Sequence, residues 1–232
     1  MTKNLRLLGQ YMNNSFELLV ALKNKGYLKT TRDPLWWPRS GTFWVIIGAI
    51  LTQQSKWENV EKSMENLERA GIDSLEMLSA LPIEQLSEYI RPSGFYNTKA
   101  KNLHLLTHAI LKEFDSFEVF CTRVDREWLL AQKGIGAESA DSILCYACKQ
   151  EAMVVDAYTA RLLTSFGYSF ESYAELQEWV EEGLLSNLSK IHVLYGKEMS
   201  LNELYARFHG KIVEFCKENS RGKTVFVDSL GI

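Results

Sequence analysis

The chain has 232 residues, and 26 lysines and arginines stand against 29 aspartates and glutamates, for a formal net charge of −3. Apolar residues make up 46% and charged residues 24%, a composition that excludes disordered, collagen-like and coiled-coil proteins. The longest apolar run, Phe43 to Leu51, is too short to cross a bilayer, and Met1 to Leu5 begin no signal peptide. We therefore expect a cytoplasmic protein with no membrane partner.

The four cysteines (Cys121, Cys145, Cys148 and Cys216) do not suggest a disulfide framework in a chain of this size. Without a secretion signal they are expected to be reduced. The acidic balance argues against a protein coated in basic surface, but it leaves room for a local basic patch. Glutamates gather between residues 171 and 182, and lysines and arginines gather elsewhere. An acidic DNA-binding protein needs such segregation, although ordinary solvated faces would also show it.

Helical periodicity dominates the chain, and strand-like alternation is nearly absent. In chain order, the expected helices are Lys56–Ala70 with Gly71 as its stop, a helix capped by Asn97, Glu138–Cys148, Tyr173–Gly183 and Leu201–Cys216. The best extended stretch, Met153–Val155, is short. The sequence therefore predicts an all-α protein of about ten helices joined by tight loops.

Residues 127–148 contain two glycines at the junction of two helical segments. An amphipathic stretch ends at Gly134-Ile135-Gly136, and a second helix begins at once, with Ser139 in its first turns. Two glycines permit a tight turn with exposed N–H groups, and Ile135 would anchor that turn in the core. Because N–H groups at a helix N-terminus favour anions, this turn is suited to binding a phosphate. A plain helical connector could have the same glycines.

A carboxylate directly follows the apolar run Val154-Val155 and precedes another helical segment. This residue, Asp156, is the candidate catalytic group. Aspartate is also a common helix N-cap, and the spacing alone leaves both roles open.

Several motifs occur in the order expected for one family. They are Leu51-Thr-Gln-Gln54, Gly94-Phe-Tyr-Asn-x-Lys99-Ala100, the hairpin glycines, Asp156 and Leu204-Tyr-Ala-Arg-Phe-His209-Gly210-Lys211. From about Gly41 to Cys216 the chain resembles the helix-hairpin-helix DNA glycosylases related to endonuclease III. Within that family, the tract Asp33-Pro-Leu-Trp36-Trp37-Pro38 and the run Arg91 to Asn97 look most similar to the small bacterial 3-methyladenine DNA glycosylases, type III.

The resemblance implies two helical lobes with an active-site cleft between them. The expected helical-barrel lobe spans residues 41–150 and contains the hairpin, and the other lobe joins residues 1–40 to residues 151–232. Asp156 would lie at the cleft. The implied partner is double-stranded DNA containing alkylated bases, in base excision repair, and we expect a monomer.

Two departures from the family refine the expected activity. Bifunctional members carry a lysine nucleophile two residues past the second glycine, where this chain has Glu138. A carboxylate cannot form a Schiff base, so hydrolysis without lyase activity is expected. Many relatives hold an iron–sulfur cluster with four cysteines after the last helix, but only Cys216 is present there. No cluster is therefore expected.

Lys211 is a third departure, on the last helix near the expected mouth of the fold, and we assign it to the base pocket. It could be a surface lysine that contacts phosphate. It could also be a buried lysine that is neutralised or chemically modified, and the sequence leaves both open.

A damaged purine inside a duplex must be flipped out, which costs roughly a few kcal/mol. The N–H groups of Gly134 and Gly136 would hold phosphates beside the lesion. The resemblance implies a monovalent cation that bridges hairpin carbonyls to phosphate, and no other cofactor. It also implies that Gln54 fills the gap left by the flipped base, and Phe95 would wedge from the opposite side. Gln54 could instead be a capping residue, and Phe95 a core residue.

Alkylation at N3 or N7 makes the purine cationic and weakens its glycosidic bond. Asp156 would stabilise the oxocarbenium-like sugar and orient the attacking water. Electron-rich aromatic faces suit a cationic base, and the candidates are Trp36, Trp37 and Trp57. The resemblance implies that Trp36 and Trp57 sandwich the base and that Pro38 shapes the pocket.

These features predict a monofunctional DNA glycosylase that hydrolyses the N-glycosidic bond of alkylated purines, with 3-methyladenine favoured. The alternatives are a non-catalytic helix-hairpin-helix DNA-binding protein and a glycosylase for mismatched adenine or oxidised pyrimidines. No catalytic metal is expected. His104 and His108 are spaced as a possible metal pair but lack a third ligand, and Cys145 and Cys148 are expected to be packing residues.

Overall fold

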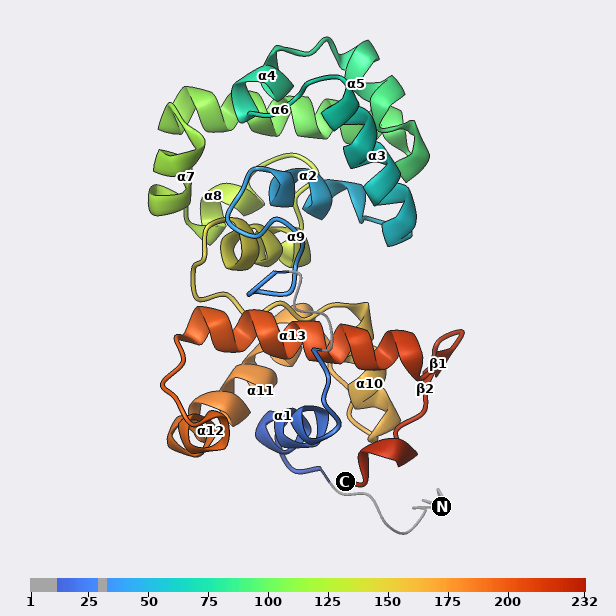
Figure 1. Ribbon diagram of the computed structural model, residues 1–232, viewed down its shortest axis with the longest axis vertical. Helices are drawn as coiled ribbons and strands as arrows, with labels where there is room; N and C mark the ends of the chain where they lie inside the picture. The colour runs from blue at the N-terminus through green and yellow to red at the C-terminus, as the bar shows by residue number, and fades with distance from the viewer. Residues whose placement is uncertain (1–11, 29–32) are drawn as a thin grey trace. The chain divides into compact units, whose positions relative to one another are not determined.

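The computed structural model describes residues 12–28 and 33–232, whose regular secondary structure is almost wholly α-helical (Figure 1). These residues form thirteen α-helices and one antiparallel pair of two-residue strands, β1 (Ser220–Arg221) and β2 (Thr224–Val225). The predicted all-α class is confirmed. Ten helices is too low a number because several helices have only five to seven residues, too few to show a period. The segment that was checked for a signal peptide, residues 1–5, lies outside the described ranges.

The chain divides into two compact units. One comprises Met1–Thr31 together with Met153–Ile232, and the other is the continuous stretch Arg32–Ala152. None of the helices described in either unit is long and apolar enough to cross a membrane. The cleft expected between two lobes stays a prediction.

The discontinuous unit is organised around its last helix. Its helices are α1 (Ser15–Asn24), α10 (Ala157–Ser165), α11 (Tyr173–Leu185), α12 (Leu188–Tyr195) and α13 (Leu201–Glu218), followed by the 3₁₀ turn η3 (Asp228–Leu230). Ser200 caps α13 by accepting from the N–H of Glu203. Leu204, Phe208 and Ile212 follow at helical spacing and are buried, and α13 packs on α1 and α10 (Figure 1).

The continuous unit is organised around its first helix. Its helices are α2 (Trp44–Leu51), α3 (Trp57–Arg69), α4 (Leu75–Ala80), α5 (Ile83–Tyr89), α6 (Tyr96–Phe114), α7 (Phe117–Arg123), α8 (Arg126–Leu130) and α9 (Ala137–Ser142), with the 3₁₀ turn η1 (Arg91–Ser93) and the π-helix η2 (Ile143–Ala147). Every residue of α2 is apolar and buried, so this helix is core on all sides. It packs against α3, α6, α9 and η2.

Two local predictions need correction, and a third feature gains detail. Asn97 does not cap its helix, because α6 already begins at Tyr96 and is preceded by Phe95 in a left-handed conformation. The single helix expected over Glu138–Cys148 is instead α9 followed by the wider turns of η2. Met153–Val155 is a buried extended segment without strand partners in the described sheet. Side-chain periodicity cannot report any of these backbone details.

Candidate active site

Asp156 caps the N-terminus of α10. Its Oδ1 accepts hydrogen bonds from the backbone N–H groups of Tyr158 and Thr159, each at 2.9 Å, and from Thr159 Oγ1 at 3.2 Å. Its Oδ2 lies 3.5 Å from Nε2 of His209 on α13. The side chain is 16% exposed. Asp156 thus caps the helix through Oδ1 alone, and Oδ2 takes no part in the cap.

The surroundings of Asp156 favour its charged form. Burial opposes ionisation, but the contact with His209 and the hydrogen bonds from Thr159 outweigh it, so the pKa of Asp156 lies below its ordinary value. His209 is only 3% exposed, so its contact with the carboxylate is shielded from water. Asp156 is therefore a carboxylate at neutral pH, the form that can stabilise positive charge on a sugar.

Lys211 lies in the same unit, on α13, and is 4% exposed. Its Nζ donates a hydrogen bond to the carbonyl of Tyr27. Burial lowers its pKa to about 8; Arg207 and Lys23 act in the same direction, and Glu214 opposes them. The alternative that Lys211 is a surface lysine contacting phosphate is therefore wrong, because its side chain is enclosed. Its chemical modification and its place in a base pocket stay predictions.

The hairpin lies in the continuous unit, where α8 packs against α9. Gly134 has a φ of +83°, and a Cβ there would come within 2.1 Å of Nδ2 of Asn102. Both the backbone conformation and the close approach require glycine. Ile135 is buried and anchors the turn.

Gly136 stands in different surroundings from Gly134. A Cβ at Gly136 would meet nothing within 4 Å. This glycine is the N-cap residue of α9 and provides no side-chain cap, whereas α10 receives one from Asp156. An uncapped helix start with open space beside it is suited to an anion such as phosphate.

The hydroxyl of Ser139 faces the interior. Ser139 is 8% exposed, and its Oγ accepts from Nε2 of Gln53 at 3.0 Å and donates to the carbonyl of Ala49 at 3.4 Å. The side chain of Ser139 thus ties α9 to the C-terminal end of α2. The DNA contact of Ser139 stays a prediction, and it would use the backbone N–H of this residue.

Gln54 and Phe95 lie on two turns of the continuous unit. Both have positive φ, 51° for Gln54 and 46° for Phe95, a conformation that costs a non-glycine residue roughly 1–2 kcal/mol. Phe95 is 68% exposed, so the alternative of a core phenylalanine is wrong. Gln54 is exposed and caps neither neighbouring helix, since the caps fall at Thr52 and Lys56. Exposed side chains on strained turns are typical of functional positions.

Trp36, Trp37 and Trp57 form one aromatic cluster with Tyr146. Trp37 lies at its centre and is 7% exposed. The rings of Trp36 and Trp57 stand at 88° and 86° to that of Trp37, with centroids 6.3 and 5.8 Å away. Both outer rings are half-buried, as is Pro38. Trp36 and Trp57 can therefore present faces to a ligand, whereas Trp37 is mainly a packing residue.

Asp33 shapes the loop that carries Trp36. Its Oδ1 accepts from the N–H of Leu35 and its Oδ2 from the N–H of Ser40, each at 3.0 Å, and its carbonyl accepts from the N–H of Trp36 at 2.9 Å. Trp36 itself has a φ of +75°. A network of this kind can hold a tryptophan in an otherwise unfavourable conformation.

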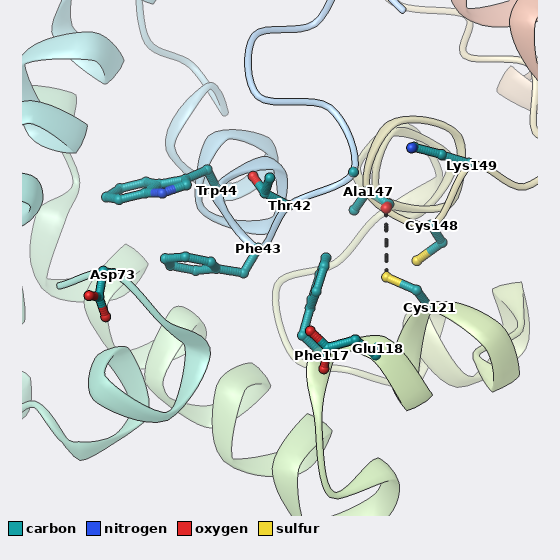
Figure 2. Close-up of a pocket in the computed structure, with 11 residues that line it drawn as sticks. Thr42, Phe43, Trp44, Asp73, Phe117, Glu118, Cys121, Ala147, Cys148 and Lys149 are labelled. Carbon is teal, nitrogen blue, oxygen red and sulfur yellow. Dashed lines mark hydrogen bonds between the residues drawn. The ribbon is translucent and has the colours of Figure 1, made fainter.

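A groove of about 490 Å³ lies elsewhere in the continuous unit (Figure 2). Trp44, Phe117, Cys121 and Cys148 help to line it, and Cys121 Sγ contacts the carbonyl of Ala147 at 3.6 Å. The residues that line this groove include none of those predicted for catalysis or DNA contact.

Potential metal ligands do not gather in residues 12–28 and 33–232, where no three histidine, cysteine or acidic side chains come together. His104 and His108 lie with ring centroids 4.1 Å apart. Nδ1 of His108 lies 3.0 Å from Ser79 Oγ and 2.8 Å from the carbonyl of His104. Hydrogen bonds within the protein thus engage the ring of His108.

The family model for the HhH-GPD superfamily base excision DNA repair protein matches residues 47–184, which contain the hairpin and Asp156. The chain belongs to this superfamily. The predicted membership of the helix-hairpin-helix DNA glycosylases is confirmed.

Individual relatives agree with this placement. A crystal structure of an H. pylori 3-methyladenine DNA glycosylase bound to 1,N6-ethenoadenine is 49% identical, with a TM-score of 0.86, and the match covers 90% of this chain and 100% of that one. A Methanocaldococcus jannaschii relative, provisionally named a DNA repair glycosylase, is 38% identical over 91% of this chain and 93% of its own length. An endonuclease III–DNA complex shares the fold, with a TM-score of 0.70 and 18% identity over 94% of this chain and 92% of that one.

Sequence reasoning missed the roles of three side chains. His209 was part of a quoted motif but was given no role, because only the packing of α13 on α10 brings it to Asp156. Gln53 and Lys99 also belonged to quoted motifs. Their long-range hydrogen bonds, to Gly134 and to Leu51, join segments that are far apart in the chain, and no local pattern signals such contacts.

Proposed function

We propose that this glycosylase is monofunctional and hydrolyses the N-glycosidic bond of alkylated purines in duplex DNA, with 3-methyladenine as the favoured base. The observation that carries the proposal is the carboxylate of Asp156. Its pKa lies below the ordinary value, and one of its oxygens stays outside the helix cap. Such a group meets the need of a reaction whose transition state is a positively charged sugar.

The departing base needs no protonation. An alkylated purine already carries positive charge, so departure of the base neutralises it and leaves the positive charge on the sugar. Asp156 would face that charge and orient or deprotonate the attacking water. His209 would keep the carboxylate ionised from its buried position 3.5 Å away. No general acid for the base is required.

Recognition of the base would rest on Trp36 and Trp57. Their half-buried rings are held by Trp37, and each face could add roughly 0.5–2 kcal/mol of cation–π attraction for a cationic purine. Pro38 would close one side of this pocket. The likeness to the H. pylori enzyme with a bound purine derivative supports this choice of substrate.

The proposed enzyme lacks lyase activity. Glu138, in the first turn of α9, occupies the position where bifunctional relatives carry their nucleophile. A carboxylate cannot form the imine on which strand cleavage depends. Incubation with borohydride, which traps such an imine, should yield no covalent DNA adduct, and an adduct would refute this part of the proposal.

The cysteines do not fit an iron–sulfur cluster. Cys216 is buried in α13, where its Sγ contacts the carbonyl of Tyr158 at 3.6 Å, and no cysteine follows it in the sequence. A monovalent cation at the hairpin fits better. The Gly134 carbonyl accepts from Gln53 at 2.9 Å and has a second lone pair for a cation. We propose that the protein acts as a monomer.

One experiment tests the activity. Methylated duplex DNA is incubated with the wild-type protein and with Asp156→Asn, and the released bases are identified. The expected result is release of 3-methyladenine by the wild type and a loss of at least about 100-fold in the variant. Absence of release would favour a DNA-binding protein without catalysis. Release of adenine or oxidised pyrimidines from matching substrates, with methylpurines retained, would favour the third alternative.

A further inference from the structure

The three turns assigned to DNA contact belong to one unit, and two partly or fully buried side chains join them. The turns are those of Gly134–Gly136, Gln54 and Phe95. The joining side chains are Gln53 and Lys99.

Lys99 reaches two of these turns from α6. It is 3% exposed, and its Nζ donates hydrogen bonds to the carbonyls of Leu51 and Ser93, each at 2.8 Å. Leu51 is the last residue of α2 and lies three residues before Gln54, and Ser93 is the last residue of η1 and lies two residues before Phe95. The ammonium therefore lies at the C-terminal carbonyls of two helical segments, where positive charge is favoured.

Gln53 reaches the third turn from the residue next to Gln54. Its Nε2 donates to the carbonyl of Gly134 at 2.9 Å and to Oγ of Ser139 at 3.0 Å. The turn that carries Gln54 is thus fixed to the hairpin on one side and, through Lys99, to the turn of Phe95 on the other.

Burial of Lys99 is unfavourable in itself. Desolvation lowers its pKa to about 8, and the two carbonyls to which it donates are neutral. A methionine of similar length would fill the same space without that penalty. The ammonium instead supplies two directed bonds that fix the separation of two turns, each holding a residue at positive φ.

We propose that Lys99 and Gln53 are positioning residues that hold the hairpin, Gln54 and Phe95 in one fixed array, so that both side chains enter the duplex together as the damaged nucleotide leaves it. This inference rests on the proposed function. Neither residue touches the base or sugar in this scheme, and each acts through the turns that it holds.

The test compares two duplexes, one with the damaged base opposite its normal partner and one with the same damaged base opposite an abasic site. Flipping out an unpaired base needs less energy, so it depends less on inserted side chains. Single-turnover base release is measured for the wild type, Lys99→Met and Gln53→Ala. Lys101→Met and Gln85→Ala, at exposed positions of α6 and α5, are the matched controls.

Lys99→Met should lower the rate of base release at least tenfold for the paired damaged base and less than threefold for the unpaired one. Gln53→Ala should show the same pattern with a smaller loss. Lys99→Arg should recover part of the rate. Equal losses on both substrates, or no loss, would overturn the inference. If Lys99→Met fails to fold in a thermal-unfolding assay, Gln53→Ala decides. A wild type that releases no base from either substrate would refute the proposed function instead.

Discussion

The two units of this glycosylase place charge differently. In the discontinuous unit, the ionisable groups Asp156, His209 and Lys211 are largely enclosed. In the continuous unit, the residues assigned to DNA are all uncharged: Gly134, Ile135, Gly136, Ser139, Gln54 and Phe95. The buried charges of that unit have other partners, since Lys99 bonds to backbone carbonyls and Asp141 pairs with Arg126. Enclosed charge suits chemistry at one atom, because low dielectric strengthens its field. Neutral turns and aromatic faces suit recognition of shape, because they fit many sequences alike.

The N-termini of α10 and α9, one helix from each unit, make the same contrast. Asp156 caps α10 with its own carboxylate, whereas α9 begins at Gly136 without a side-chain cap. A capped helix start presents negative charge, and an uncapped one attracts it. In the proposed function the two helix starts have opposite tasks, since that of α10 would face a cationic sugar and that of α9 would face phosphate.

The largest expected effect is on base release, in substitutions that distinguish the charge of Asp156 from its capping of α10. Asparagine caps helices about as well as aspartate but has no charge. Asp156→Asn should keep the thermal stability near that of the wild type and still lose at least about 100-fold in base release. Asp156→Ala should lose both activity and about 1 kcal/mol of unfolding free energy. Urea denaturation and single-turnover assays check this. Normal activity in Asp156→Asn would end the catalytic assignment.

The second effect separates the two glycines of the hairpin. Gly134→Ala should reduce the unfolding free energy by about 2 kcal/mol, since its φ is positive and Asn102 occupies the space of a Cβ. Gly136→Ala should reduce the unfolding free energy by no more than about 1 kcal/mol, because nothing lies near its Cβ and the loss is that of a poorer N-cap residue.

DNA affinity provides the complementary measurement for the hairpin. Gly136→Arg should weaken binding to undamaged duplex in a fluorescence anisotropy titration while leaving the fold intact, since the bulky side chain would occupy the place expected for phosphate. Unchanged affinity in this variant would count against the hairpin as the phosphate contact.

The third effect concerns the aromatic faces. Trp57→Ala should reduce the processing of alkylated DNA about tenfold, within the range of one cation–π contact, and should change affinity for undamaged DNA by less than twofold. Trp128→Ala, at a tryptophan packed on Phe114 and Phe120, is the control for lost core packing. Equal losses of both properties in Trp57→Ala would assign Trp57 to folding.

The smallest effect concerns the enclosed charge of Lys211. The unfolded lysine keeps its proton up to about pH 10.5, whereas the folded pKa is about 8. The unfolded state therefore binds more protons between these values, and Lys211 makes stability rise with pH by about 1 kcal/mol from pH 8 to pH 9. Lys211→Met should make the change in stability between these pH values less positive. Lys99, whose pKa is similarly lowered, and three cysteines, whose raised pKa values act in the opposite direction, set the change that remains. Urea unfolding at the two pH values checks this, and an unchanged pH dependence in the variant would contradict it.

Local sequence patterns determined much of this protein. Apolar spacing predicted the helices now seen as α3, α11 and α13 to within two residues at each end, and two glycines with Ile135 predicted the hairpin turn. These features depend on neighbours along the chain, since helical period and backbone freedom are properties of short segments. The motifs in their order were enough for the family.

Only the tertiary structure decided which side chains meet. The sequence placed Ser139 among the DNA contacts and left Lys211 open between a surface and a buried position. Packing encloses both side chains, the first against α2 and the second at the carbonyl of Tyr27. Phe95 could have been core and is instead exposed. The contact of His209 with Asp156 and the bridge from Lys99 to two turns join distant parts of the chain. Burial and long-range contact arise from how helices pack, and a helical period fixes only which residues share a face.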